Sequence, residues 1–278
     1  MAPTLRGASL RWSCDKCDVS TLTSQLQIRE LAEQGRAIVC FNCGSRHRVD
    51  ESQYPPVNPD VVRIVPINDQ TTVQRGQVVV VTREGKFQVK RVAAIPGDRV
   101  SLDLDVLQVN GESIATPAID GGAHDRSITL FELTPRTLER LQRREKGWFL
   151  LPPNAYRDSR RESWLDDTPY NVGVSRRLNS IDQVKIEFDK PLRWQFDRRL
   201  TILEDLPREQ LLGLKVYRPI IHRLNQIHRR DGYPLKLMDH QFFLVGDNAP
   251  VSVDSRDWGP VDGGALKYRV VGIERPSE

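Results

Sequence analysis

Two groups of residues in this 278-residue chain have types and spacings suited to chemistry, and the first is a single lysine. Lys90 stands in the segment QVKRVAAIPGD, inside a run of β-forming residues. On an alternating strand it shares a face with Val92 and Ala94, whereas Arg91 points the other way. A small apolar face desolvates the ammonium group, which lowers the pKa and favours a role as a base. The alternative is an ordinary exposed strand lysine.

The second group consists of the four cysteines of the chain, arranged as two C-x2-C pairs with 22 residues between the pairs: Cys14, Cys17, Cys40 and Cys43. Each pair can hold a metal ion from one tight turn, and together they complete a tetrahedral site of four sulfurs. Gly44 supplies the backbone freedom that such a turn often needs. Because four thiolates leave no open position, we expect a structural zinc ion in a zinc-ribbon-like module of residues 8–50. The alternative is a redox or disulfide set.

Composition excludes little. There are 41 basic and 37 acidic residues, and the net charge of +4 is too small to indicate nucleic-acid binding by itself. Arginines cluster between Arg136 and Arg230, but acidic residues are interleaved with them, which is typical of a solvated surface. Nucleic-acid binding through the ribbon and the arginines is therefore not favoured. A steep salt dependence of DNA or RNA binding would support it.

No apolar run reaches about 18 residues and no signal peptide is evident, so a cytoplasmic chain is the default expectation.

The elements that must position Lys90 are short β-like runs. Strands are expected at VVRIVPI, GQVVVVT and FQVKRVAAI, followed by a turn at Pro96-Gly97-Asp98 and a hairpin at Asn110-Gly111. Later strands are expected at QVKIEF, LRWQF, RRLTIL, QFFLVGDN and YRVVGI. Helices are expected from Thr134-Pro135 to Gly147 and over LKVYRPIIHRLNQIHRR. The pattern predicts a mainly β (α+β) domain over residues 51–278, with an irregular α+β insertion at about 115–240.

Two segments resemble signature boxes of the signal peptidase I family (peptidase S26), the membrane-bound serine proteases that remove signal peptides with a Ser/Lys dyad. VKRVAAIPGD is similar to the family's lysine box, and FFLVGDNAPVSVDSRDWGPV (242–261) is similar to its closing box. RGQVVVV and LQVNGESI resemble the strand before the lysine box and the hairpin after it. The resemblance covers about residues 52–115 and 240–275. It implies a coiled β-sheet or partly open barrel.

The resemblance also implies roles for the matching residues. Lys90 would be the general base, and Ser252 and Asp254 would position it by hydrogen bonds. An ion pair between Asp254 and Arg256 would hold the loop. The other residues of the closing box would form the turn and scaffold near the site: Gly246, Asp247, Asn248 and Ser255.

The nucleophile is less well defined, because the family's box, Ser-Met-x-Pro-Thr, is not present in full. One register uses Ser52, in SQYPPVNPDVVRIV, and keeps the proline three positions later at Pro55. The other aligns NDQTTVQRG and puts Asn68 at the nucleophile, where an asparagine cannot serve. We favour Ser52, because 38 residues separate it from Lys90 and leave room for both intervening strands, whereas Asn68 leaves only 22.

The resemblance thus implies a serine endopeptidase that acts on a polypeptide with small residues before the cleavage site. A zinc-ribbon-like module occupies the place of the family's transmembrane anchor. Either the enzyme docks to a membrane through a membrane-associated partner, or its substrates are not membrane-inserted signal peptides. The alternative hypothesis is an inactive signal-peptidase-like scaffold that binds peptides or proteins through the ribbon and the insertion. Loss of activity in Ser52→Ala would distinguish the two.

Overall fold

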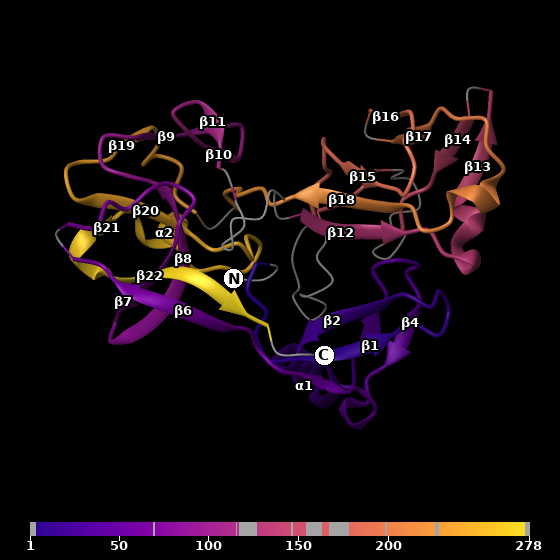
Figure 1. The fold of residues 1–278 in the computed structure, drawn as a ribbon, viewed down its shortest axis with the longest axis horizontal. Helices are drawn as coiled ribbons and strands as arrows, with labels where there is room; N and C mark the ends of the chain where they lie inside the picture. The colour runs from indigo at the N-terminus through magenta and orange to yellow at the C-terminus, as the bar shows by residue number, and fades with distance from the viewer. Residues whose placement is uncertain are drawn as a thin grey trace. The chain divides into compact units, whose positions relative to one another are not determined.

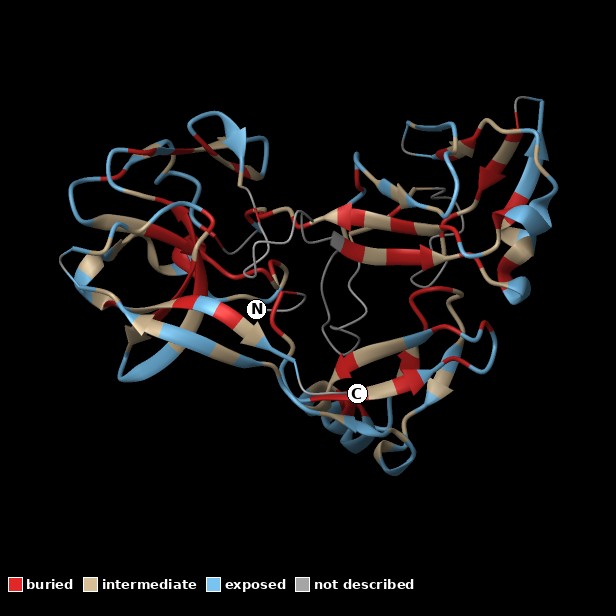
Figure 2. Ribbon diagram, in the orientation of Figure 1, coloured by how far each residue is buried: buried red, intermediate tan, exposed pale blue. Residues whose placement is uncertain are grey.

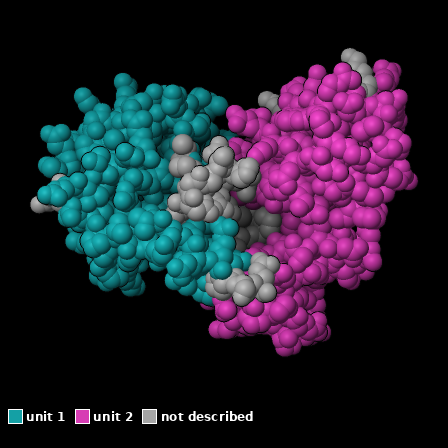
Figure 3. Space-filling view, in the orientation of Figure 1, with its two compact units in different colours: residues 1–7, 59–126, 220–278 teal, residues 8–58, 127–219 magenta. Residues whose placement is uncertain are grey.

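The computed structural model describes residues 4–68, 70–114, 116, 127–145, 147–153, 163–166, 178–197, 199–225 and 228–275. The chain divides into two compact units, coloured separately in Figure 3. Unit 1 comprises residues 1–7, 59–126 and 220–278, and unit 2 comprises residues 8–58 and 127–219. The cysteine module and most of the insertion are therefore grouped in the same unit.

Unit 1 is built on a six-stranded antiparallel sheet, with the order β21-β20-β8-β7-β22-β6 (Figure 1). The strands are β6 (Val61–Pro66), β7 (Val78–Arg83), β8 (Lys86–Ala94), β20 (Gln241–Val245), β21 (Val261–Asp262) and β22 (Leu266–Glu274). The four valines of β7 are all buried because both faces of the strand are covered: Val79 and Val81 pack in one cluster, and Val78 and Val80 pack in another. Buried residues also fill the C-terminal half of β8 and most of β20 (red in Figure 2).

A second sheet of unit 1 has the order β11-β10-β9-β19. Its strands are β9 (Arg99–Asp103), β10 (Val106–Val109), β11 (Glu112–Ser113) and β19 (Leu235–Lys236). Asn110 and Gly111 have φ values of 54° and 86°, the left-handed conformation that a tight type I′ hairpin requires, so the predicted hairpin is confirmed. Val100 and Leu107 of this sheet pack with Phe243 of β20. Short helices α2 (Ser255–Trp258) and η5 (Gly263–Ala265) complete the unit.

Unit 2 begins with the cysteine module. Its elements are β1 (Ser9–Ser13), β2 (Ser20–Ser24), α1 (Gln25–Glu33), β3 (Ala37–Val39), β4 (Arg46–Arg48), η1 (Glu51–Gln53) and β5 (Pro56–Val57). β1 lies between β2 and β5, while β3 and β4 form a separate hairpin. Ile28 and Leu31 of α1 pack with Leu10, Trp12 and the cysteines, so the module has a small core of its own.

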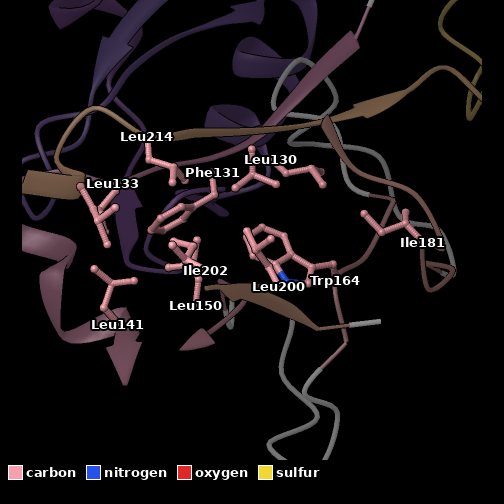
Figure 4. Packing of buried hydrophobic residues seen from close by; sticks show 12 residues of the cluster. Leu130, Phe131, Leu133, Leu141, Leu150, Trp164, Ile181, Leu200, Ile202 and Leu214 are labelled. Atoms are coloured by element: carbon pink, nitrogen blue, oxygen red, sulfur yellow. The ribbon is translucent and has the colours of Figure 1, made fainter. Parts of the chain in front are cut away.

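The rest of unit 2 consists of two sheets, with the orders β12-β18-β15 and β13-β14-β17-β16. Their strands are β12 (Ser127–Glu132), β13 (Leu141–Arg144), β14 (Gly147–Leu150), β15 (Lys185–Glu187), β16 (Trp194–Phe196), β17 (Leu200–Ile202) and β18 (Lys215–Pro219). Short helices η2 (Pro135–Arg140) and η4 (Arg208–Leu211) connect them. Phe131, Trp164 and Leu200 are among the buried residues that fill the space between the sheets (Figure 4).

The predicted fold class is confirmed: the chain is mainly β, and its sheets are open, with no closed barrel among the described residues. The first helix prediction is right at its start, where Thr134 is the N-cap and Pro135 the first helical residue, but wrong in length, and the second is wrong. Residues 135–140 form only the short helix η2, and the chain then enters β13, which pairs with β14. LKVYRPIIHRLNQIHRR contains β18, whose residues pair with β12 and β15 on either side. Nothing in the described part of the chain is a helix long and apolar enough to cross a membrane.

Candidate active site and metal centre

Lys90 is the buried lysine that the strand pattern predicts. It lies on β8 opposite Val79 of β7, with only 9% of its surface exposed, next to the fully buried Val92. Its Nζ donates a hydrogen bond to Ser252 Oγ at 3.1 Å. Burial lowers the pKa of Lys90, the charge of Asp254 partly opposes this effect, and Arg256 reinforces it. The environment therefore favours the neutral amine, the form that accepts a proton.

The loop after β20 brings Ser252 to Lys90. Asn248 O accepts hydrogen bonds from the backbone N–H groups of Val251 and Ser252, at 3.1 and 2.9 Å, which closes the turn. Ser255 Oγ accepts from Leu244 N at 2.9 Å and ties α2 to β20. The resemblance assigned scaffolding to Asn248 and Ser255, and their contacts fit that role.

Asp254 and Arg256 form the expected ion pair, and both side chains are buried. Arg256 Nε and Nη2 donate to the two carboxylate oxygens of Asp254, each at 2.8 Å. Asp254 also accepts from the backbone N–H groups of Gly246 and Arg256. Burial alone would raise the pKa of Asp254, but these hydrogen bonds outweigh it, so the pKa is lowered. A charged, fully bonded carboxylate therefore holds the loop beside Lys90.

Gly246 is required for the close approach of this loop. A Cβ at this position would lie 2.0 Å from Ser252 Oγ, a distance that neither atom can tolerate. We expect Gly246→Ala to displace Ser252 and lower kcat by about 10²-fold, the usual scale for a misplacement of about 1 Å. The measurement is kcat for the peptide cleavage that the resemblance implies. Gly232→Ala, where a Cβ meets nothing within 4 Å, is the control. Wild-type kcat in Gly246→Ala would show that the Ser252 contact is dispensable.

A second buried network lies beside the lysine. Arg91 is fully buried, and its Nε and Nη2 donate to the two carboxylate oxygens of Asp247 at 2.8 and 2.6 Å. Arg91 Nη1 donates to Gly76 O at 2.6 Å. Thr4 Oγ1 donates to Asp247 and accepts from Arg91 Nη2 at 3.4 Å. Arg91 does point away from the face of Lys90, as alternation requires, but toward a buried carboxylate.

Thr4 is a site residue that the sequence interpretation missed, although a signal was present. The chain begins Met1-Ala2-Pro3-Thr4, which matches the last four positions of Ser-Met-x-Pro-Thr. Only four of the five positions are matched, and the serine is not among them. His222, whose Nε2 lies 3.2 Å from Gly246 O, was missed for a different reason. It lies in a segment that was interpreted as a helix and resembles neither box.

The two predicted nucleophile positions lie in different units. Ser52 belongs to unit 2, where it is exposed on η1 and its Oγ donates to Asp50 Oδ1 at 2.6 Å. Lys90 belongs to unit 1, so a bond between Ser52 and Lys90 stays a prediction. Asn68, in unit 1, is exposed and its side chain accepts from Gln70 N and Thr71 Oγ1.

The four cysteines converge in unit 2, as their spacing predicts. Their sulfurs all lie within 4.8 Å of one another, and the pairs Cys14–Cys43 and Cys17–Cys40 have Sγ···Sγ distances of 3.6 and 3.7 Å. A tetrahedral zinc ion with bonds of about 2.3 Å needs sulfur–sulfur separations of about 3.8 Å. The residues present therefore fit a zinc ion. Gly44, at a φ of 77°, provides the left-handed turn expected after the second pair.

The cysteine module is bonded to the insertion strands of the same unit. Asn42, between the second pair of cysteines, donates to Glu132 O at 2.9 Å and accepts from Glu132 N at 2.6 Å. Arg140 Nη2 donates to Cys43 O at 3.1 Å. The second cysteine turn thus serves as a docking point for β12 and η2.

The site thus consists of a buried lysine with a lowered pKa that is hydrogen-bonded to Ser252, in the loop that begins with Gly246-Asp247-Asn248. The family model of "Signal peptidase, peptidase S26" matches residues 35–166, just under half of the chain, including Ser52 and Lys90. Signal peptidase I of Bacillus amyloliquefaciens is 41% identical over 44 residues. That alignment covers 16% of this chain and 24% of the relative. The resemblance to the peptidase S26 family is thereby confirmed.

Proposed function

We propose that this protein is a serine endopeptidase of the signal peptidase type, with Lys90 as its general base. The observation that carries the proposal is the buried Nζ of Lys90, whose pKa is lowered by burial and which is hydrogen-bonded to Ser252. A lysine can activate a serine only as the neutral amine, and this environment favours that form.

In the proposed reaction Ser52 Oγ attacks the scissile carbonyl carbon while Lys90 Nζ accepts the hydroxyl proton. The tetrahedral intermediate collapses, the peptide C–N bond breaks, and Lys90 returns the proton to the leaving amine. Water then hydrolyses the acyl ester, again with Lys90 as the base. The Ser52 N–H is the proposed oxyanion donor; it donates to Asp50 Oδ1 at 3.1 Å in this structure and would exchange that carboxylate for the oxyanion. We propose a polypeptide substrate with small residues before the cleavage site, presented by a membrane-associated partner.

Ser52→Ala tests the nucleophile. If Ser52 attacks the substrate, kcat should fall by at least about 10³-fold, because the remaining groups cannot form the acyl-enzyme. Cleavage of a peptide with alanine before the scissile bond is the measurement, and trapping of a covalent adduct on Ser52 provides a second readout. Ser20→Ala, an exposed serine of the same unit, is the control. Full activity in Ser52→Ala would exclude Ser52.

A second register rests on Thr4. If Met1-Ala2-Pro3-Thr4 is the nucleophile box, the serine of the box falls immediately before Met1. Thr4 supports this register because it is bonded to Asp247 and Arg91, in the same unit as Lys90. A serine placed directly before Met1 should then give activity that survives Ser52→Ala and is lost in Lys90→Met. An alanine placed directly before Met1 instead should not give activity that survives Ser52→Ala.

We also propose that Cys14, Cys17, Cys40 and Cys43 bind one structural zinc ion. Because the metal would hold a module with a small core, its removal should lower the unfolding midpoint of unit 2 by roughly 10 °C or more, from several kcal/mol of metal stabilisation at about 3 °C each. Calorimetry with and without a chelator, and metal analysis of Cys17→Ser, are the measurements. Ser45→Ala, which removes only a hydroxyl 2.9 Å from Cys43 Sγ, should keep the zinc. If the metal-free protein unfolds at the same midpoint temperature as the untreated protein, this proposal is contradicted.

A further inference from the structure

The segment at residues 220–225, through which the chain enters unit 1 from β18, is held on the β9–β10 hairpin. His222 O accepts a hydrogen bond from Leu107 N at 2.9 Å, and Asp105 O accepts one from Leu224 N at 2.8 Å. Val106 and Arg223 form an antiparallel bridge between these contacts. Backbone pairing on this scale fixes the direction of each side chain in the segment, including His222.

This segment makes polar contacts with the loop that carries Ser252. His222 Nε2 lies 3.2 Å from Gly246 O, and Arg256 Nη1 donates to Arg223 O at 3.0 Å. Three residues beyond Asn225, His228 Nε2 lies 3.2 Å from Asp257 Oδ1. The loop is thus supported from residues that no sequence motif singled out.

His222 acts as a neutral hydrogen-bond donor. The side chain is 2% exposed, and burial lowers its pKa to about 4, with a further contribution from Arg256 that the carboxylates of Asp254 and Asp247 partly oppose. A neutral imidazole carries one proton, and because Nε2 faces a carbonyl oxygen, that proton must lie on Nε2. Nδ1 is buried without a hydrogen-bond partner among the described residues. Among the described residues, the hydrogen bond that the ring makes is therefore the one to Gly246 O.

Gly246 is fixed on both sides by this contact and by Asp254. Its carbonyl accepts from His222, and its N–H donates to Asp254 Oδ2 at 2.8 Å. Ser252 Oγ occupies the space where a Cβ of residue 246 would lie, and it accepts the hydrogen bond from Lys90 Nζ. A rotation of the Gly246 peptide would therefore move the group that holds the lysine.

We infer that His222 is a positioning residue for Lys90, acting through the Gly246 carbonyl and Ser252. The inference rests on the proposed function in that Lys90 is taken as the base. When the His222 contact is lost, the loop loosens, water reaches Nζ, and the desolvation of Lys90 is reduced. The acidic limb of the pH–rate profile should then move to higher pH, because the lysine is protonated over a wider range.

The test compares His222→Gln, whose amide can donate near the position of Nε2, with His222→Leu, which has no donor. We expect His222→Leu to lower kcat by about 10- to 10²-fold and to move the acidic limb upward, while His222→Gln stays within about threefold of wild type. The exposed His240 supplies a control in His240→Asn, which should change neither quantity. If His222→Leu does not fold, His222→Asn replaces it, because its shorter amide does not reach Gly246 O.

A direct readout separates this inference from the proposed function. The pKa of Lys90 is measured by NMR titration of its Cε, which needs no substrate. A higher Lys90 pKa in His222→Leu than in wild type supports the inference even if no peptide is cleaved. An unchanged Lys90 pKa overturns it, as does an equal loss of kcat in the glutamine and leucine variants with an unshifted pH profile. Absence of cleavage by the wild-type protein with a shifted pKa would instead reject the peptidase proposal alone.

Discussion

Lys90→Met should abolish peptide cleavage, with kcat falling by about 10³-fold or more, while the folded protein becomes more stable. The loss of rate follows from removal of the proposed general base, because a general base typically contributes 10²- to 10⁴-fold. Methionine keeps the length and apolar stem of lysine beside Val92, so packing on β8 is retained. Lys86→Met, at the exposed start of the same strand, is the matched control and should retain activity.

The gain in stability follows from the direction of the Lys90 pKa shift. Burial lowers the pKa of Lys90 in the folded state below the ordinary value of 10.5, so between these two pKa values the unfolded chain binds more protons than the folded one. Stability therefore rises with pH across that window, and below it the folded protein carries the full cost of the buried ammonium. Lys90→Met removes this dependence.

Urea unfolding of wild type and Lys90→Met at neutral pH and near pH 10 measures the effect. The difference in unfolding free energy should shrink as the pH rises through the window. Cleavage retained in Lys90→Met would refute its role as a base. An unchanged activity combined with an unchanged pH dependence of stability would indicate an ordinary strand lysine.

Arg91→Met should be strongly destabilising, by about 3–5 kcal/mol, because it leaves the Asp247 carboxylate buried without its cation. Both side chains of this pair are fully buried, and Thr4 is bonded to the same carboxylate. In contrast, Arg230→Met breaks an exposed ion pair with Asp105 in the same unit and should cost less than about 1 kcal/mol. The measurement is the free energy of unfolding from urea titration.

The double variant Arg91→Met/Asp247→Leu distinguishes loss of a charge partner from loss of packing. Replacement of a whole buried ion pair by apolar groups of similar size is often close to neutral, so much of the lost stability should return. If the double variant is as unstable as the two single changes added together, the destabilisation comes from packing and the charge argument fails. We expect kcat to fall in both, because Asp247 follows Gly246 directly in the loop that holds Ser252.

Local patterns in the sequence determined several features of this protein. The alternation around Lys90 predicted that it shares an apolar face with Val92 and Ala94 and that Arg91 points the other way, because successive side chains of a strand point to opposite faces. Asn110-Gly111 specified its hairpin through backbone conformation alone. The two C-x2-C pairs predicted a four-sulfur cluster, because each pair folds locally and only one further contact is needed. The signature segments also indicated the family, because each of them is a continuous stretch of the chain.

Tertiary structure decided the features that depend on pairing over long distances. The segment LKVYRPIIHRLNQIHRR (214–230) was interpreted as a helix, but at residues 215–219 the strands β12 and β15 supply backbone partners on both sides, so β18 forms there. Thr4 and Asp247 meet across 243 residues of sequence, and His222 meets the Gly246 carbonyl across 24. No local pattern encodes these contacts, because they arise only when separate strands place their side chains in the same buried space. For this reason the lysine could be predicted from sequence, whereas the groups that hold it in place could not.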